Sequence, residues 1–275
     1  MSTATVAAGP QVGNAPASLG HVLHSEWTKL RSVRSTIWAL AGLFVVTVGF
    51  GVLTSWLTAH YWTKASAADR LRFDPTSTSL AGLAFGQLAI AVLGVMVISA
   101  EYSTGGIRTS LTAVPSRIRL LAAKTGVFLV VAFVAGVITS FVAFYAGQAF
   151  FAGAGGPASA SLADPGVLRA VFGGALYITA SGLLGLACGV LLRHTAGAIT
   201  VAVAFLFVIP IVLAAVPGDI GKAIQRYFTS NAGQQIVYVH QQGNYLTPWV
   251  GFGIFCLWFA VPLAAGAWLM HRRYS

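Results

Sequence analysis

Six long apolar runs constrain this chain more than any other feature of its sequence. They cover residues 37–59, 80–100, 121–151, 167–192, 197–216 and 249–270. A helix needs roughly 20 mostly apolar residues to cross the hydrocarbon core of a membrane. Backbone groups inside lipid must be hydrogen-bonded within the protein, and these continuous runs lack the short alternating segments of a membrane β-barrel. The sequence therefore predicts an all-α membrane protein with six transmembrane helices.

The composition supports one membrane domain over residues 19–275. The chain is 57% hydrophobic and only 8% charged, with a mean hydropathy of +0.80, whereas soluble domains are about a quarter charged. The net charge of +10 does not indicate nucleic-acid binding, because the basic residues are scattered among apolar runs. Residues 1–18, rich in small residues and Pro, are predicted to be a disordered tail. Cys188 and Cys256 lie inside apolar runs and are expected to fill the core.

The distribution of Lys and Arg predicts that both termini face the cytoplasm. With the N-terminus inside, ten basic residues fall inside and six fall outside. The inner ten are Lys29, Arg31, Arg34, Arg108, Arg117, Arg119, Lys124, Arg193, Arg272 and Arg273. The chain is thus expected to be a multi-pass protein of the plasma membrane, with residues 101–124 in the cytoplasm.

Residues 19–34, just before the first run, repeat apolar side chains at helical spacing. The apolar positions are Leu19, Val22, Leu23, Trp27, Leu30 and Val33, and His24, Lys29, Arg31 and Arg34 lie largely on the other side. This pattern favours an amphipathic helix in the inner membrane interface. A plain basic flank that only sets topology is the alternative.

The stretch EYSTGGIRTSLTAVPSRIRLLAAK, residues 101–124, gathers charge in a weakly charged chain. Gly105 and Gly106 permit a bend below the membrane, and Pro115 ends a short helix expected over 107–114. The segment fits a docking surface for a cytoplasmic protein. It fits equally well a connector whose arginines hold the topology.

The loop between the fifth and sixth runs, residues 217–248, has Ile220, Ile224, Tyr227 and Phe228 at helical spacing. It is predicted to be a short helical lid packed on the outer ends of the spans, or else an ordinary interfacial loop.

We expect no buried Asp, Glu, Lys or Arg within the runs, which argues against ion- or proton-coupled transport. The polar residues inside the runs are mild. The candidates for lining a pathway are Gln87, Tyr145, Gln148, Tyr177, Thr179 and Ser181. Such residues could contact a substrate, but hydrogen bonding between packed helices is the favoured interpretation.

Motifs of catalysis are missing from the sequence. It contains neither a phosphate-binding GxxxxGK[ST] loop nor an HExxH motif, and no histidine has a metal-like spacing to another ligand. The chain is therefore not expected to be an enzyme, to hydrolyse ATP by itself or to bind a metal.

Two segments carry a resemblance to a known family: SEWTKLRSVRSTIWAL, residues 25–40, and the charged stretch at 101–124. Both resemble segments of the type-2 ABC transporter permeases of actinobacteria. The resemblance implies six membrane helices after an amphipathic interfacial helix, and two permease copies, identical or related, around a central pathway. It also implies a separate ATP-binding subunit that holds ATP and Mg, and short re-entrant helices near residues 219–228.

The resemblance also assigns a role in coupling to the ATP-binding subunit. The matching residues are Trp27, Lys29, Arg31, Arg34, Glu101, Tyr102, Gly105, Arg108, Thr109, Pro115, Arg117 and Arg119. The expected function is the permease subunit of an ATP-driven exporter of amphipathic or hydrophobic cargo. A membrane sensor or assembly protein that binds a cytoplasmic partner without transport is the alternative.

Overall fold

The computed structural model describes residues 19–103, 117–153, 156–241, 243 and 245–272. This part of the chain contains helices and loops but no strand. The predicted tail at 1–18 and the predicted short helix at 107–114 lie outside the described residues. The helices are α1 (Leu19–Ser32), α2 (Arg34–Tyr61), η1 (Trp62–Lys64), α3 (Ala67–Arg72), α4 (Pro75–Ser79), α5 (Leu83–Ser103), α7 (Arg117–Phe151), α8 (Val167–Leu192), α9 (Thr195–Val203), the π-helix η2 (Ala204–Val208), α10 (Ile209–Ala214), α11 (Gly218–Tyr227), α12 (Thr229–Gln234), η3 (Gln235–Val237) and α13 (Pro248–Arg272).

Among the residues that the structure describes, six helical segments are long and apolar enough to cross a membrane, as the sequence predicts. They are Arg34–Lys64, Leu83–Ala100, Ile118–Phe151, Val167–Leu192, Thr195–Ala214 and Pro248–Leu269. The second segment starts a few residues later than expected, because Asp74 and Pro75 first begin the separate helix α4. The Asp74 carboxylate accepts hydrogen bonds from the backbone N–H groups of Thr76 and Ser77, which caps that short helix.

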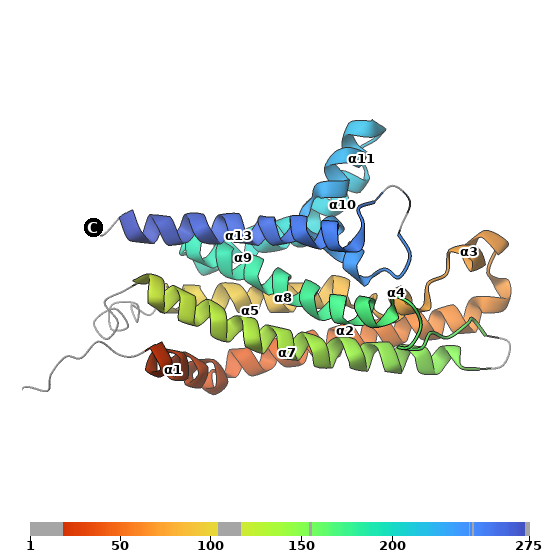
Figure 1. Ribbon diagram of the computed structural model, residues 1–275, viewed down its shortest axis with the longest axis horizontal. Coiled ribbons are helices and arrows are strands. Elements are labelled where there is room, and N and C mark those ends of the chain that lie inside the picture. Colours follow the sequence, from red (N-terminus) through yellow and green to blue (C-terminus); the bar gives the residue numbers. More distant parts are fainter. Residues whose placement is uncertain (1–18, 104–116, 154–155, 242, 244, 273–275) are drawn as a thin grey trace, which may run out of the picture.

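The long helices run side by side along the longest axis of the molecule (Figure 1). Helix α8 is central: it packs against α5, α7 and α13, and α2 packs against α5 and α7. Helix α1 and the last turns of α13 lie at one end of the bundle, which we call the α1 end. Helices α3 and α4 lie at the opposite end, the α3 end.

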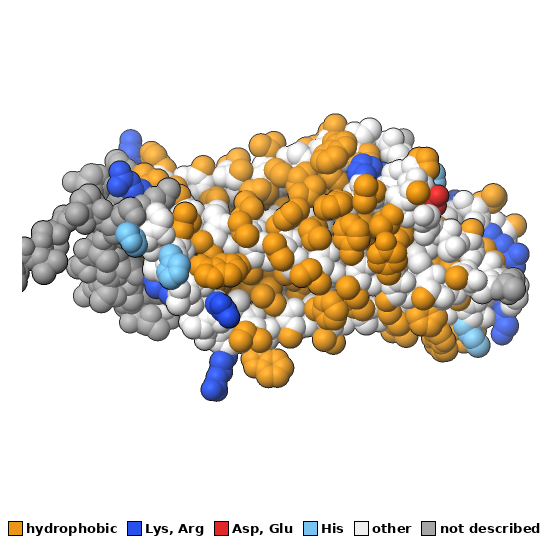
Figure 2. Space-filling model, turned by 60° about the horizontal axis from the view of Figure 1, so that its bottom comes forward, with side chains coloured by type: hydrophobic (Ala, Val, Ile, Leu, Met, Phe, Trp, Pro, Cys, Tyr) orange, Lys and Arg blue, Asp and Glu red, His pale blue; other side chains and the backbone are white. Residues whose placement is uncertain are grey.

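The surface of the bundle has the pattern of a protein immersed in lipid (Figure 2). Hydrophobic side chains cover the middle of the face that the figure shows, and Lys and Arg lie mainly towards the two ends. Because charge is costly inside a bilayer, this arrangement fits a multi-pass membrane protein.

The segment between the fifth and sixth spans divides into two parts. Helix α11 forms over residues predicted to be helical and projects sideways from the bundle (Figure 1). Its residues Ile220 and Ile224 are 78% and 48% exposed, so α11 is not the packed lid that we expected. The part that packs is α12 with η3, whose small residues Ala232 and Gly233 allow close contact with α13.

Candidate coupling site and polar residues of the spans

Helix α1 is attached to α7 by a buried ion pair at the α1 end. The Lys124 ammonium donates to Glu26 Oε2 at 2.6 Å, and the Lys29 ammonium donates to Glu26 Oε1 at 3.0 Å. Glu26 is 2% exposed and Lys124 is 5% exposed, whereas the side chain of Lys29 is 47% exposed. A buried carboxylate is tolerated only where cations and hydrogen bonds compensate it, and Glu26 has two such partners.

A buried apolar cluster lies one turn from this ion pair, and a cavity lies beside it. Val22, one turn before Glu26 on α1, forms a buried cluster with Leu120 and Ala123 of α7. A cavity of about 180 Å³ lies next to the pair, between α1, α2, α5 and α7. It is lined by Glu26, Lys29, Leu30, Val33, Ser35, Thr36, Leu93, Met96, Val97, Ala100 and Lys124. The ion pair thus joins α1 to the third span beside the last turns of α5.

The buried Lys124 corrects our expectation that no charged residue is buried in an apolar run. Lys124 is seven residues into α7, about 10 Å along the helix axis. It lies near the end of the span, where a pair with Glu26 avoids the cost of an isolated charge in lipid. The sequence held a signal for this pair, because Glu26 lies between Val22 and Leu30 on the buried stripe of α1.

The residues predicted to couple to an ATP-binding subunit gather at the α1 end where the structure describes them. Trp27, Lys29, Arg31, Arg34 and Arg119 all have exposed side chains. Glu101 and Tyr102 lie in the last turn of α5, and Arg117 is the first residue of α7. The others, Gly105, Arg108, Thr109 and Pro115, lie outside the described residues.

Three of the polar residues predicted to line a pathway form hydrogen bonds between elements. The Tyr177 hydroxyl in α8 donates to Gln87 Oε1 in α5, and the amide of Gln87 donates to the carbonyl of Leu206 in η2 at 3.4 Å. At the α3 end, the amide of Gln148 donates to Pro75 O and Ser79 Oγ at 2.9 and 3.0 Å. These contacts fit the interpretation that polar residues hold packed helices together.

The other three residues differ among themselves. Thr179 and Ser181 are buried and donate to carbonyls one turn earlier in α8, those of Ala175 and Tyr177. Tyr145 is 59% exposed. A pathway-lining role for any of the six residues stays a prediction.

Sequence reasoning missed one member of the polar cluster, Gln234 of α12. Its amide donates to the Tyr177 hydroxyl at 3.1 Å. Tyr177 is ten residues into α8, about 15 Å along the axis, so α12 reaches deep between the spans. No local pattern marks Gln234, because its partner lies 57 residues away in the chain.

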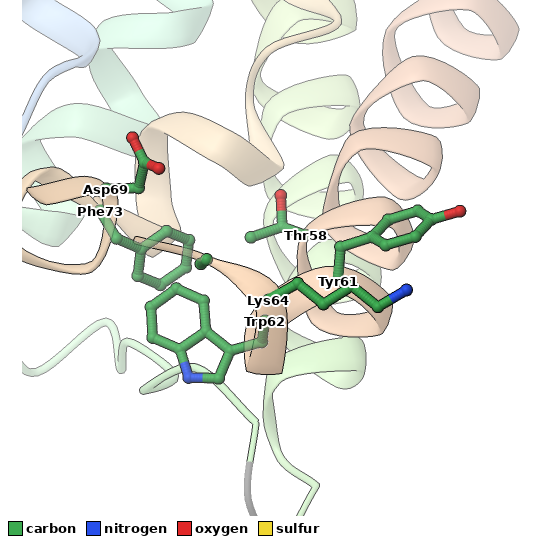
Figure 3. A pocket seen from close by; sticks show the side chains of 7 residues that line it. Thr58, Tyr61, Trp62, Lys64, Asp69 and Phe73 are labelled. Atoms are coloured by element: carbon green, nitrogen blue, oxygen red, sulfur yellow. The ribbon is translucent and has the colours of Figure 1, made fainter. Parts of the chain in front are cut away.

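A pocket at the α3 end lies between the end of α2, η1 and α3 (Figure 3). Trp62 packs against Phe73 with ring centroids 5.0 Å apart, while Tyr61 and Lys64 point away from that pair. The Arg70 guanidinium lies 5.5 Å from the Trp62 ring and donates to the carbonyls of Trp62 and Thr63. Because Arg70 already stacks on Trp62, this pocket is best explained as a joint that orders the loop after α2.

The comparison with protein families shows the family to which the chain belongs. Residues 22–211 match the model of a family described as ABC-2 family transporter protein. The chain belongs to the ABC-2 family of transporter permeases. A search among curated proteins finds no match.

The matched range covers α1 from residue 22, the ion pair of Glu26 and Lys124, the first four candidate spans and the fifth as far as residue 211. Permeases of this family are the membrane subunits of ABC transporters and lack the ATP-binding cassette. The sequence contains no phosphate-binding loop, which agrees with such a membrane subunit. Helices α11, α12 and α13 follow the matched range.

Proposed function

We propose that this permease is the membrane-spanning subunit of an ATP-driven exporter and that it docks a separate ATP-binding subunit at its α1 end. Two copies, identical or related, form the translocation pathway. Both termini face the cytoplasm, and ATP and Mg are bound by the partner subunit. The family membership supports the general class, and the buried attachment of α1 to α7 supports the coupling role.

In an ATP-driven exporter, the motion of the ATP-binding subunit has to be transmitted to the membrane helices. A partner that moves on ATP binding must act through rigid contacts, because soft ones would absorb the motion. The pair of Glu26 and Lys124 makes α1 and the third span move together. The exposed cations of α1, among them Lys29 and Arg31, then offer a surface to an acidic region of the partner.

The first experiment tests the partner. The chain is purified from its native membrane in mild detergent, and co-purifying proteins are identified by mass spectrometry. We expect an ATPase with a phosphate-binding loop whose activity changes when the two proteins are reconstituted in liposomes. A sensor or assembly protein would instead bring down a partner without ATPase activity, and that result would overturn the proposal.

The second experiment tests coupling with a charge exchange. Glu26→Lys alone and Lys124→Glu alone should each leave an uncompensated buried charge, at a cost of about 3–5 kcal/mol. ATP-dependent transport should fall at least tenfold in both variants and recover in part in the double variant that carries both changes. Lys222→Glu is the control, because Lys222 is exposed on α11. Full transport in both single variants would show that the pair does not couple α1 to the spans.

A further inference from the structure

A cavity of about 300 Å³ lies between the beginning of α5, with α4, and the pair of α12 and η3. It is lined by Ser77, Thr78, Leu80, Ala81, Leu83, Ala84, Gln234, Val237 and Tyr238. Its volume is at the lower end of the range for pockets that hold small molecules. The cavity is distinct from the cavity beside Glu26, which lies at the α1 end.

The hydrogen-bond cluster of the spans fixes which atom Gln234 can offer to an occupant. The amide of Gln87 donates to carbonyls of Ala84 and Leu206, so its oxygen must accept from the Tyr177 hydroxyl. The Tyr177 hydroxyl has only one hydrogen, which it donates to Gln87. Its oxygen must therefore accept the hydrogen bond from the Gln234 amide. Among the described residues no hydrogen bond reaches Oε1 of Gln234, which remains as an acceptor.

Three hydroxyl-bearing residues also line the cavity. The hydroxyls of Ser77 and Thr78 donate to the carbonyl of Asp74, which leaves the Tyr238 hydroxyl. Within the described part of the chain it has no hydrogen-bond partner. Burial, together with the nearby charge of Asp74, raises the pKa of the Tyr238 phenol. A phenol whose pKa is ordinary or raised is protonated at neutral pH, so the Tyr238 hydroxyl can donate a hydrogen bond.

The remaining lining makes the cavity suited to an uncharged molecule. Leu80, Leu83 and Val237 supply apolar surface, and none of the lining residues carries a formal charge at neutral pH. An anionic ligand would lose its hydration here without gaining a counter-ion, and the nearby carboxylate of Asp74 would repel it. We propose that this cavity binds a neutral amphipathic small molecule that donates one hydrogen bond to Gln234 and accepts one from Tyr238.

The cavity is also connected to the fifth span. Gln234 contacts Tyr177, Tyr177 contacts Gln87, and Gln87 contacts the carbonyl of Leu206 inside the π-helix. An occupant that holds Gln234 in place would stabilise this chain of hydrogen bonds. The inference deepens the proposed function by naming the class of molecule that is exported, but binding itself requires only this chain.

The test uses a photoreactive probe of the inferred class, 4-(hydroxymethyl)benzophenone, which has one hydroxyl donor and one carbonyl acceptor. The purified chain in detergent is irradiated with the probe, digested and analysed by mass spectrometry. We expect adducts on residues that line the cavity, such as Leu83 and Val237. The anionic analogue 4-benzoylbenzoate, of similar size, should neither label these residues nor compete for them.

Two substitutions separate the cavity from general labelling of apolar surface. Tyr238→Phe and Gln234→Leu should each lower the adduct yield in the cavity about fivefold, the loss expected for one hydrogen bond. Tyr238→Phe is the cleaner variant, because it breaks no hydrogen bond in the structure. Tyr227→Phe is its matched control, since Tyr227 is exposed on α11. The melting temperature of each variant checks that the fold is intact.

Three results would overturn the inference: adducts only outside the cavity, unchanged yields in both variants, or equal labelling by the anionic analogue. Because the assay contains no ATPase, its result is independent of the partner experiment. Labelling of the cavity without an ATPase partner would support the binding site and overturn the proposed exporter function. An ATPase partner without labelling would support the exporter function and overturn the binding site.

Discussion

The fourth and fifth spans are both apolar runs of membrane-crossing length, yet they are built in opposite ways. In α8, 83% of the most apolar 18-residue stretch is buried, against 22% in the segment Thr195–Ala214. Helix α8 is one unbroken helix of 26 residues. The fifth span is interrupted by the π-helix η2 and contains Pro210. The difference separates a fixed scaffold from a span whose hydrogen bonding depends on its neighbours.

Glycines explain the burial of α8. A Cβ atom added at Gly185 would lie 2.1 Å from the carbonyl oxygen of Ala91 in α5, and one added at Gly94 would lie 2.1 Å from that of Gly182. The two backbones therefore touch directly. Small residues at such crossings allow dispersion contacts that lipid does not replace, and these contacts hold membrane helices together.

Pro210 explains the irregular fifth span. It has no N–H group, and the N–H of Ile209 bonds to Ala204 O five residues earlier, in the π pattern. The carbonyls of Phe205 and Leu206 instead accept hydrogen bonds from side chains. Thr229 Oγ1 of α12 donates to Phe205 O at 2.5 Å, and Gln87 Nε2 of α5 donates to Leu206 O at 3.4 Å. The fifth span thus depends on α5 and α12 for hydrogen bonds that α8 makes within itself.

The largest effect is expected at the α5–α8 crossing. Gly185→Leu would push a side chain into the backbone of Ala91, and because no flexible atom can give way, α5 and α8 would have to separate. We expect loss of most folded protein, measured as the monodisperse peak in size-exclusion chromatography of detergent extracts. Gly253→Leu is the control, because the structure has nothing within 4 Å of a Cβ at Gly253. Equal yields of the two variants would mean that this crossing does not fix the scaffold.

A smaller effect is expected at the cluster that links the two spans. Tyr177→Phe would leave Gln87 Oε1 without its donor in a buried site, at a cost of about 1–3 kcal/mol. The midpoint of thermal unfolding in detergent should fall by several degrees. Tyr145→Phe, at an exposed tyrosine of α7, should leave the midpoint unchanged. If both variants melt alike, the cluster contributes nothing to the contact between spans.

The sequence predicts the scaffold well because lipid imposes a simple rule. Every backbone group in the membrane must be bonded internally, so six runs of the right length mean six helices. The family match covers the charged and apolar segments on which the resemblance rested, from residue 22 onward. Pro210 stood inside the fifth run and could have predicted an interruption there.

Contacts between distant residues could not be predicted in the same way. Glu26 and Lys124 are 98 positions apart, and Gln234 and Tyr177 are 57 apart. Glu26 lies on the apolar stripe of residues 19–34, but the sequence does not show that Lys124 is its partner. Tyr177 lies in an apolar run and Gln234 in a loop, and no sequence pattern joins them. The apolar positions of α11 predicted its helix, but the same pattern fits a helix that faces lipid, and Ile220 is 78% exposed.

The hydrogen bond by which α12 supports the fifth span can be removed by replacing a single hydroxyl group. Thr229→Val keeps the shape of this buried residue but deletes the hydroxyl that donates to Phe205 O. We expect a loss of about 1 kcal/mol in stability, the size typical of a hydrogen bond between membrane helices. Amide exchange around residues 204–209 should become faster. An unchanged exchange rate would show that Phe205 O does not need Thr229.

The smallest effect on stability, and the sharpest test of the comparison, is expected at Pro210. Pro210→Ala restores an N–H that can bond to Leu206 O, so the fifth span could close as a regular α-helix like α8. Stability should change by less than about 1 kcal/mol, because the new backbone bonds replace those to Thr229 and Gln87. Amide exchange at residues 204–211 should slow. Pro262→Ala is the matched control, because Pro262 lies inside α13 without a π-helix. If the two variants change exchange equally, Pro210 is not the cause of the π-helix, and the contrast between the fourth and fifth spans must come from their neighbours alone.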